Sequence, residues 1–302
     1  MIPASWSEPL LSYVWQVVVH SSVMGVVFYI WAHRIGLPSG RTKRRLLTLL
    51  LVLPLFTAAV PGRGAPEFRE RIAWLDSGRL TAIPVGAGLQ VSHLALAAGL
   101  LVVALTLWQE LWPSFRRRHT SGGPVPDSLT AIVRERAGWA DCRIMMTASE
   151  VVMLATGGLL GRPWLLVSRG ALDSLSGDEL AAVVRHEHAH WRSGRWLHSH
   201  TLFVVRMLQC HNPVALWCFR EYCVEVEIAC DADAVAGRDA HLLVRPLLRI
   251  YESIDRRDAA ARGALRKRVN VLLAGGPSDD ALPAPTVAAA AIVMLLVLPW
   301  LV

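Results

Sequence analysis

Apolar residues gather in four long runs along the chain, separated by polar and charged segments. Three runs lie in the first part and the fourth ends the sequence, and they cover residues 10–32, 46–60, 91–112 and 286–302. A run of about 20 apolar residues is long enough for a helix to cross the hydrocarbon core of a bilayer. The second run is shorter and contains Pro54, which predicts a kinked or tilted helix. The pattern therefore predicts a multi-pass α-helical membrane protein with about four spans.

The pattern changes between residues 120 and 284, where short apolar runs are followed by longer helical stretches. The runs 143–147, 151–155 and 164–168 are typical of strands, and the glycines between them are typical of turns. Ser176 and Glu179 have the spacing of a capping box, which predicts a helix that continues past residue 190. Two further helices are expected over about 213–236 and 240–253. A segment of this length can form one α+β domain with its own core.

The chain carries a net charge of +7, with 53% apolar and 18% charged residues. Its arginines and lysines are concentrated beside the apolar runs, in segments 34–45 and 116–118. Positive residues flank membrane spans on the cytoplasmic side, so both segments are expected there. We therefore predict a protein of the cell membrane whose N-terminus and loop 61–90 lie outside. Its membrane region covers 1–119, a cytoplasmic domain covers 120–284, and the span 286–302 returns the C-terminus to the outside.

The segment Val184–His190 contains the spacing His-Glu-x-x-His. In a helix, residues four apart share a face, so His186 and His190 can bind one metal ion together. Glu187 lies beside the first histidine and can act as general base toward the attacking water. The spacing is typical of zinc hydrolases, most often peptidases, in which three protein ligands leave one position open. It predicts one Zn²⁺ per chain.

The third ligand has to come from another part of the chain. A further histidine six residues after the second motif histidine is excluded, since Trp196 occupies that position. The other common solution is a glutamate on a following helix, and Glu227 fits it. Asp231 shares the helix face of Glu227 and could accept a hydrogen bond from a ligand histidine, which would fix the orientation of its ring. Glu225 and Asp233 are alternatives on spacing alone.

The remaining polar residues of this segment are expected to have other roles. His188, His198, His200 and His211 are expected at the surface, at an interface or around the site rather than as ligands. The basic run 266–268 is interpreted as a solvated or membrane-facing patch. The five cysteines contain no Cys-x-x-Cys pair, and we expect them to be reduced thiols, most of them buried.

Several segments together resemble the BlaR/MecR family of membrane zinc metallopeptidases, the antibiotic-sensing signal transducers. They are 158–170, 175–190, 212–213 and 227–231, with a weaker likeness over 268–273. Their order along the chain agrees, as do three spans before the domain and one after it. The resemblance implies a zincin-like (gluzincin) fold, with His186, His190 and Glu227 as zinc ligands and Glu187 as the base.

The resemblance also implies a role in signalling. In that family, a penicillin-binding sensor outside the membrane follows the last span, and activation leads to loss of a cytoplasmic repressor. We expect no such sensor and no direct β-lactam acylation here, because only the fourth predicted span follows residue 285. A signal would then arrive through loop 61–90, through the spans or from a sensor partner protein.

The predicted function is that of a membrane-bound zinc endopeptidase that hydrolyses a cytoplasmic or membrane-proximal protein. A winged-helix transcriptional repressor is the favoured substrate, the lipid bilayer is the other partner, and no direct nucleic-acid binding is expected. An extended substrate peptide could pair with a sheet edge near 151–155. Two alternatives stay open: a housekeeping or maturation peptidase of the HtpX or prenyl-protein-processing type, and a non-enzymatic membrane receptor with a decayed site.

Overall fold

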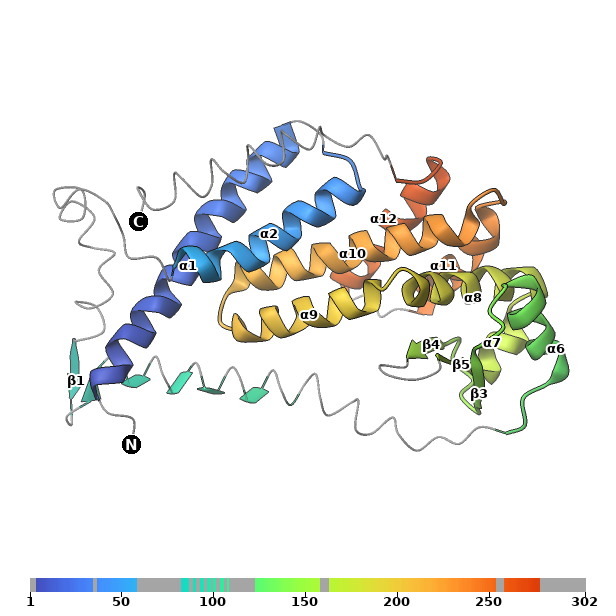
Figure 1. Cartoon of the computed structure of the whole chain (residues 1–302), viewed down its shortest axis with the longest axis horizontal. Coiled ribbons are helices and arrows are strands. Elements are labelled where there is room, and N and C mark those ends of the chain that lie inside the picture. Colours follow the sequence, from blue (N-terminus) through green and yellow to red (C-terminus); the bar gives the residue numbers. More distant parts are fainter. Residues whose placement is uncertain are drawn as a thin grey trace. The chain divides into compact units, whose positions relative to one another are not determined.

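A computed structural model of the chain shows a mostly helical α+β protein with two small sheets, which confirms the predicted class (Figure 1). The structure describes residues 4–34, 37–58, 83–86, 89–90, 93–94, 97–98, 100–101, 104–105, 108, 123–157, 163–253 and 258–277. The predicted span 286–302, most of the span 91–112 and most of loop 61–90 lie outside these residues.

The chain divides into two compact units. One unit contains Met1–Phe115, Thr201–Tyr222 and Asp280–Val302, and the other contains Arg116–His200 and Cys223–Asp279. The predicted domain boundaries at residues 120 and 284 stay a prediction. We call the first the helical unit and the second, which holds a three-stranded sheet, the sheet-containing unit. Helices α9 (Arg195–Leu208) and α10 (Pro213–Val235) contribute residues to both.

The helical unit is built on α1 (Ala4–Arg34) and α2 (Arg41–Thr57), which pack against each other. The His20 Nδ1 and Thr57 Oγ1 atoms lie 2.8 Å apart, and the Tyr13 hydroxyl donates to the Leu55 carbonyl at 2.9 Å. A short antiparallel pair, β1 (Pro84–Gly86) and β2 (Leu89–Gln90), lies within the predicted outer loop. These contacts join two of the apolar runs through polar atoms that would otherwise be buried without partners.

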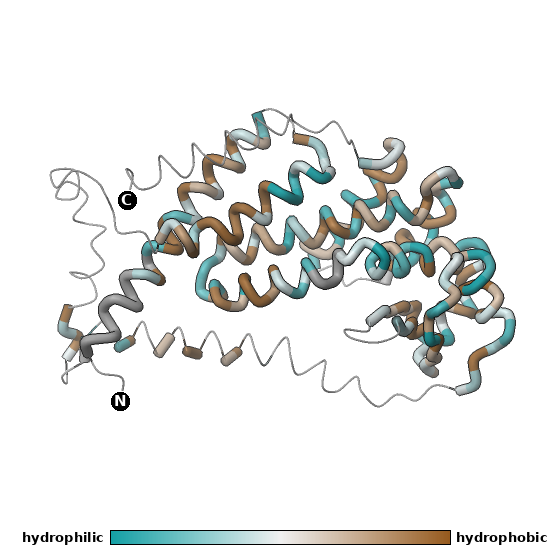
Figure 2. Tube along the Cα trace, viewed as in Figure 1, coloured by the Kyte–Doolittle hydropathy of each residue, from teal (hydrophilic) through white to brown (hydrophobic). Residues whose placement is uncertain are grey.

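By length and composition, one helix among the described residues, Gln16–Arg34, could cross a membrane, and it falls in the first predicted span. The second predicted span falls in α2, which starts with basic residues and becomes hydrophobic after them (Figure 2). The number of spans therefore stays a prediction.

The sheet-containing unit has a three-stranded sheet in the order β3-β5-β4. Strands β3 (Arg143–Thr147) and β5 (Trp164–Ser168) lie where the sequence predicts them and pair in parallel. Strand β4 covers Leu154–Gly157 and pairs antiparallel with β5, so the predicted strand 151–155 is placed too early. The reason is a bend, in which the Val151 amide donates to the side-chain oxygen of Ser149 before the strand pairing begins.

Helices make up the rest of this unit. A short helix α6 (Asp127–Ala131) continues into a π-helical turn, and α7 (Arg169–Ser174) follows β5. The later helices are α8 (Gly177–Arg192), α9 (Arg195–Leu208), α10 (Pro213–Val235), α11 (His241–Ser253) and α12 (Ala259–Leu273). The predicted start of α8 and both predicted ends of α10 and α11 agree with the structure to within about one residue. Helices α9 and α12 were not predicted.

Helix α8 is fixed at its start and along two faces. Both bonds of the predicted capping box are present, from the Ser176 amide to Glu179 Oε2 at 2.9 Å and from the Glu179 amide to Ser176 Oγ at 3.3 Å. Val184 packs into the core beneath the sheet, and Ala182 packs into a second core with α11 and α12. Helix α8 therefore lies between two cores, which hold its remaining face in a defined orientation.

Candidate metal centre

The two motif histidines lie one turn apart on α8. Their ring centroids are 4.9 Å apart, and the Nε2 atoms face each other at 3.2 Å. His186 is buried and His190 is partly buried. The helical geometry thus brings two nitrogen donors toward one point, as the four-residue spacing predicts.

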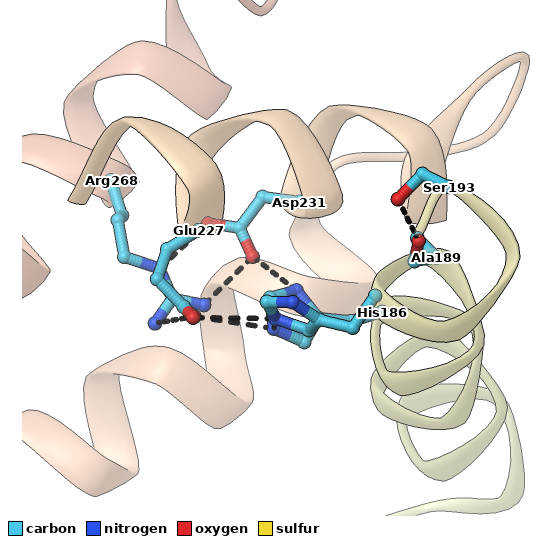
Figure 3. Close-up of polar contacts among 7 residues, drawn as sticks. His186, Ala189, Ser193, Glu227, Asp231 and Arg268 are labelled. Carbon is cyan, nitrogen blue, oxygen red and sulfur yellow. Dashed lines mark hydrogen bonds and ion pairs between the residues drawn. The ribbon is translucent and has the colours of Figure 1, made fainter. Parts of the chain in front are cut away.

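Helix α10 brings a carboxylate to the same point (Figure 3). The Glu227 Oε2 atom lies 3.3 Å from His186 Nε2, and its Oε1 atom lies 3.3 Å from His190 Nε2. The three side chains form a group whose donor atoms could hold one metal ion. A tetrahedral zinc ion with ligand bonds of about 2.0–2.1 Å holds its ligand atoms about 3.3–3.4 Å apart. The two imidazole nitrogens have the spacing of a zinc ligand pair, and each lies within 3.3 Å of one oxygen of the Glu227 carboxylate, so the three side chains converge closely enough to hold one zinc ion.

Asp231 lies one turn after Glu227 on α10 and contacts the other nitrogen of the first histidine. Its Oδ1 atom is 2.7 Å from His186 Nδ1, and the carboxylate is fully buried. The ring N–H does not point straight at this oxygen, so the contact is close but not linear. A carboxylate at this position favours the proton on Nδ1 of the ring. The lone pair of Nε2 is then available to bind a metal ion.

Arg268 on α12 contacts both carboxylates. Its Nε and Nη2 atoms donate to the two Asp231 oxygens at 2.7 and 2.8 Å, and Nη1 lies 3.0 Å from Glu227 Oε2. In Figure 3, Glu227 and Asp231 lie between His186 on one side and Arg268 on the other. The side chain of Arg268 is 13% exposed. The interpretation of 266–268 as a solvated patch is therefore wrong for this residue.

The groups around the site carry charges that a divalent cation would balance. Glu187, Glu227 and Asp231 are carboxylates, and Arg268 supplies one positive charge. With both imidazoles neutral, as metal ligands must be, two net negative charges remain. Burying two net negative charges costs free energy unless a cation neutralises them.

The interactions shift the pKa values of the site residues in opposite directions. Burial by itself would lower the pKa of His186, but the Asp231 and Glu227 carboxylates raise it well above its usual value. Burial likewise opposes the rise in the pKa of His190, which contacts with Cys230 and Glu227 bring to about 9. In the opposite sense, the two imidazoles hold the pKa of Glu227 well below its usual range despite its burial. The histidines and Glu227 are thus strongly coupled.

Glu187 differs from the other carboxylates of the site. Burial raises its pKa, while the neighbouring charges of His186, His190 and Arg268 act in the opposite direction. Its charge therefore interacts with the same residues that surround the candidate metal position. A raised carboxyl pKa suits a group that must accept and release a proton near neutral pH.

Helices α8 and α10 are tied together directly beside the histidines. Arg185 Nε donates to the Ala234 carbonyl at 2.9 Å. Ala182 and Ala234 are both fully buried, and small side chains of this kind allow two helices to approach closely. The residue before His186 therefore fixes the distance between the helix with the two histidines and the helix with Glu227.

The alternative ligands have other partners. Glu225 is fully buried and accepts a hydrogen bond from Lys267 at 2.9 Å. Neither Glu225 nor Asp233 belongs to the metal-binding group found among the described residues. His188 stacks on Trp139 with ring centroids 4.9 Å apart, which places it in contact with the core rather than in that group.

Comparison with known proteins identifies the family. The model of the BlaR1 peptidase M56 family matches residues 89–245, which is just over half of the chain. The chain belongs to the BlaR1 peptidase M56 family. It is therefore a membrane-associated metallopeptidase, which agrees with the resemblance to BlaR/MecR proteins. No curated protein matched the chain.

The M56 match covers α8 and α10 but ends before α12, so it does not include Arg268. The sequence carried a usable signal for this residue. Leu265, Val269 and Leu272 recur at helical spacing and are buried, and Arg268 lies next to that apolar face. A charge beside a buried helical face is a candidate for an internal ion pair.

Proposed function

We propose that this chain is a membrane-bound zinc endopeptidase that hydrolyses a cytoplasmic or membrane-proximal protein, with a transcriptional repressor as the favoured substrate. The observation that carries the proposal is the convergence of His186, His190 and Glu227, in which the two Nε2 atoms lie 3.2 Å apart and each lies 3.3 Å from one oxygen of the carboxylate. Family membership supports a metallopeptidase, and the donor geometry favours zinc.

Each residue would have one task. His186, His190 and Glu227 would hold the zinc ion, and Asp231 would orient the ring of His186. When bound, zinc acts as a Lewis acid that polarises the scissile carbonyl and activates water. Glu187 would take a proton from the attacking water and return it to the leaving amine.

Arg268 would position the ligands. It holds Glu227 Oε2 at 3.0 Å, so Oε1 is the oxygen left without this competing contact. The same guanidinium donates a hydrogen bond to each oxygen of Asp231. A planar guanidinium can make such contacts with two carboxylates at fixed angles, which an ammonium group cannot.

Strand β4 would bind the substrate. Within the described sheet, β4 pairs with β5 alone and so has one edge available, and it packs beside α8. An extended peptide could add to that edge through main-chain hydrogen bonds, which place few demands on its sequence. This supports a protein substrate held next to the helix that carries Glu187.

The test compares the parent protein with Glu187→Gln. Glutamine has nearly the same size but cannot carry the proton, so we expect cleavage to fall by about 10²–10⁴-fold. Proteomics of cells with either form would find the substrate as a protein whose new termini require Glu187. Elemental analysis of the purified protein should give one zinc per chain in both forms.

Glu252→Gln is the matched control, since Glu252 lies exposed on α11 and the chemical change is the same. We expect this variant to cleave like the parent. Undiminished cleavage by Glu187→Gln would show that the assignment of the base is wrong, and a protein purified without zinc would contradict the metal assignment.

A further inference from the structure

Residues 201–222 form a helical hairpin, made of the end of α9, a turn and the first part of α10. They belong to the same compact unit as α1 and α2, although about a hundred and fifty residues separate them in the sequence. We propose that this hairpin enters the lipid bilayer beside α1 and α2, turns within it and leaves on the side from which it entered. The partner of its outer face is the acyl-chain region. This proposal concerns membrane placement and does not depend on the peptidase activity.

Polar side chains at the turn bind the middle of α1 and α2. Gln209 Nε2 donates to the Leu51 carbonyl at 2.7 Å, and Asn212 Nδ2 donates to Ser21 Oγ at 2.8 Å. Both amides are almost completely buried. A polar turn at this position is therefore enclosed by protein, which is the condition under which an irregular backbone occurs at membrane depth.

The first part of α10 also packs closely on α1. A Cβ atom added at Gly25 would lie 2.7 Å from Val214 Cγ1, so only glycine permits this approach. The ring of Trp217 lies 6.4 Å from the rings of Phe28 and Tyr29. Contact through small residues is typical of helix pairs in membranes, where close van der Waals packing provides much of the attraction.

Several backbone groups of the turn are hydrogen-bonded within the hairpin. The Cys210 amide donates to the Met207 carbonyl at 3.2 Å, and the Asn212 amide donates to the Gln209 carbonyl at 2.8 Å. Asn212 Oδ1 then accepts from the Val214 amide at 3.0 Å and caps the start of α10. These groups are satisfied without water, as a turn inside the hydrocarbon requires, whereas Nε2 of His211 in the same turn is buried without a hydrogen-bond partner in the structure.

The depth of the turn follows from its contacts. At 1.5 Å per residue, Leu51 lies about 8 Å along α2 from Leu46, and Ser21 lies about 17 Å along α1 from Ala32, the cytoplasmic ends of the two predicted spans. The basic residues beyond both ends fall in the segment predicted to be cytoplasmic. A hydrocarbon core is about 30 Å thick, so at these depths the turn lies inside it and does not reach the far side. The hairpin is thus re-entrant and does not span.

The other end of the hairpin lies at the basic end of α2. Lys43 Nζ is 3.7 Å from Glu221 Oε2. About 12 Å of helix separates Glu221 from Pro213 at the start of α10, and the same length separates Lys43 from Leu51 on α2. The α10 arm of the hairpin and α2 therefore both begin at the ion pair between Lys43 and Glu221 and reach the same depth.

Large apolar side chains of this unit are exposed on α1, α2 and α9. They are Val26, Val27, Tyr29, Ile30, Phe56, Val204 and Leu208, and Leu208 is 67% exposed. Figure 2 shows hydrophobic residues along the end of α9 as well as along α1 and α2. Four of them, Val26, Val27, Tyr29 and Ile30, belong to the helix that can cross a membrane, which favours lipid as the occupant.

One charged residue, Arg206, lies within the hairpin arm of α9. Its guanidinium lies 5.5 Å from the ring centre of Phe203 and 5.7 Å from that of Phe219. Cation–π contacts of this kind are stronger away from water, and they keep the charge on the protein side of the hairpin.

The test places a fluorescent label at position 208 of the full chain. Cys210 and Cys223, which are partly exposed, are first replaced by serine, and Leu208→Cys is then labelled and reconstituted into phosphatidylcholine–phosphatidylglycerol vesicles. We expect nitroxides near the middle of the acyl chains to quench this label about five-fold more than a label at Leu273→Cys, because they reach only groups within the hydrocarbon core. Leu273 is a matched exposed leucine on α12 of the sheet-containing unit.

Iodide in the water should show the opposite order, with strong quenching at 273 and little at 208. Equal iodide quenching at both positions would overturn the proposal, and so would shielding of 208 from both lipid and water, which would indicate a protein partner. A monodisperse elution profile confirms that each labelled variant is folded. The measurement is repeated with Glu187→Gln, so that its result is separate from that of the activity test.

Discussion

Arg268 shows how much the candidate site depends on one residue outside the recognised motif. Asp231 is fully buried, and its two oxygens contact Arg268 and the ring of His186. The guanidinium and the imidazole hold the pKa of Asp231 below its usual value although burial acts in the other direction. Removing the arginine would leave a buried carboxylate without its main partner, which costs about 3–5 kcal/mol.

The conservative change Arg268→Lys tests this positioning role. Lysine keeps the positive charge but cannot make the three contacts of the guanidinium with Asp231 and Glu227. We therefore expect zinc affinity to fall by about 10–100-fold while the fold is retained. Competition with a fluorescent chelator measures the affinity. Arg266→Lys on the exposed side of the same helix is the control and should bind zinc like the parent. Unchanged affinity in Arg268→Lys would limit Arg268 to a general stabilising role.

At the scale of the elements, close backbone contacts decide how the sheet meets the helix before α8. Gly170 donates its amide to the Ser149 carbonyl at 3.0 Å. A Cβ atom at Gly170 would overlap the Glu150 carbonyl, which belongs to the backbone and cannot move as a side chain would. The bend before β4 and the start of α7 therefore fit only with glycine at this position.

Gly170→Ala should destabilise the protein by about 3 kcal/mol, because the bend must shift to accommodate the methyl group. Gly263→Ala is the matched control on α12, where an added Cβ would meet no atom within 4 Å. There the helix should gain about 0.5–1 kcal/mol, because alanine loses less backbone entropy than glycine. Chemical unfolding of both variants gives the two values, and a mild effect at Gly170 would contradict the close contact.

At the scale of the whole molecule, the candidate metal site joins three helices of the sheet-containing unit. His186 and His190 come from α8, Glu227 and Asp231 from α10, and Arg268 from α12. A ligand that binds only the folded state stabilises it in proportion to the logarithm of its concentration over its dissociation constant. Metal should therefore contribute to the stability of the fold as well as to activity.

Removing zinc with a chelator should lower the melting temperature by about 10 °C, if the zinc concentration is about a thousand times its dissociation constant. Differential scanning fluorimetry measures the shift. Zinc should restore the original value and magnesium should not, because two of the three donors are imidazole nitrogens. His190→Ala is the control and should show no response to chelator. A chelator-dependent shift in this variant would place the stabilising metal elsewhere.

Sequence patterns predicted most of the local structure. The capping box at Ser176, strands β3 and β5 and the starts of α8 and α10 lie where local propensity and spacing put them. The His-Glu-x-x-His spacing placed both histidines on one helix face for the same reason, since a helix has a fixed period. The helix with Glu227 was also predicted, and its face with Asp231 follows from the four-residue spacing.

The tertiary structure decided which faces meet. Spacing left Glu225 and Asp233 open beside Glu227, and only the packing of α10 on α8 brings Glu227 within 3.3 Å of both imidazoles. The pairing of Arg268 with Asp231 and the burial of Gln209 against Leu51 join residues far apart in the sequence. Such contacts depend on the packing of whole helices, which local periodicity cannot specify. The sequence by itself thus determined that the two candidate zinc ligands and the candidate base share one helix, and the fold decided which distant residues lie around them.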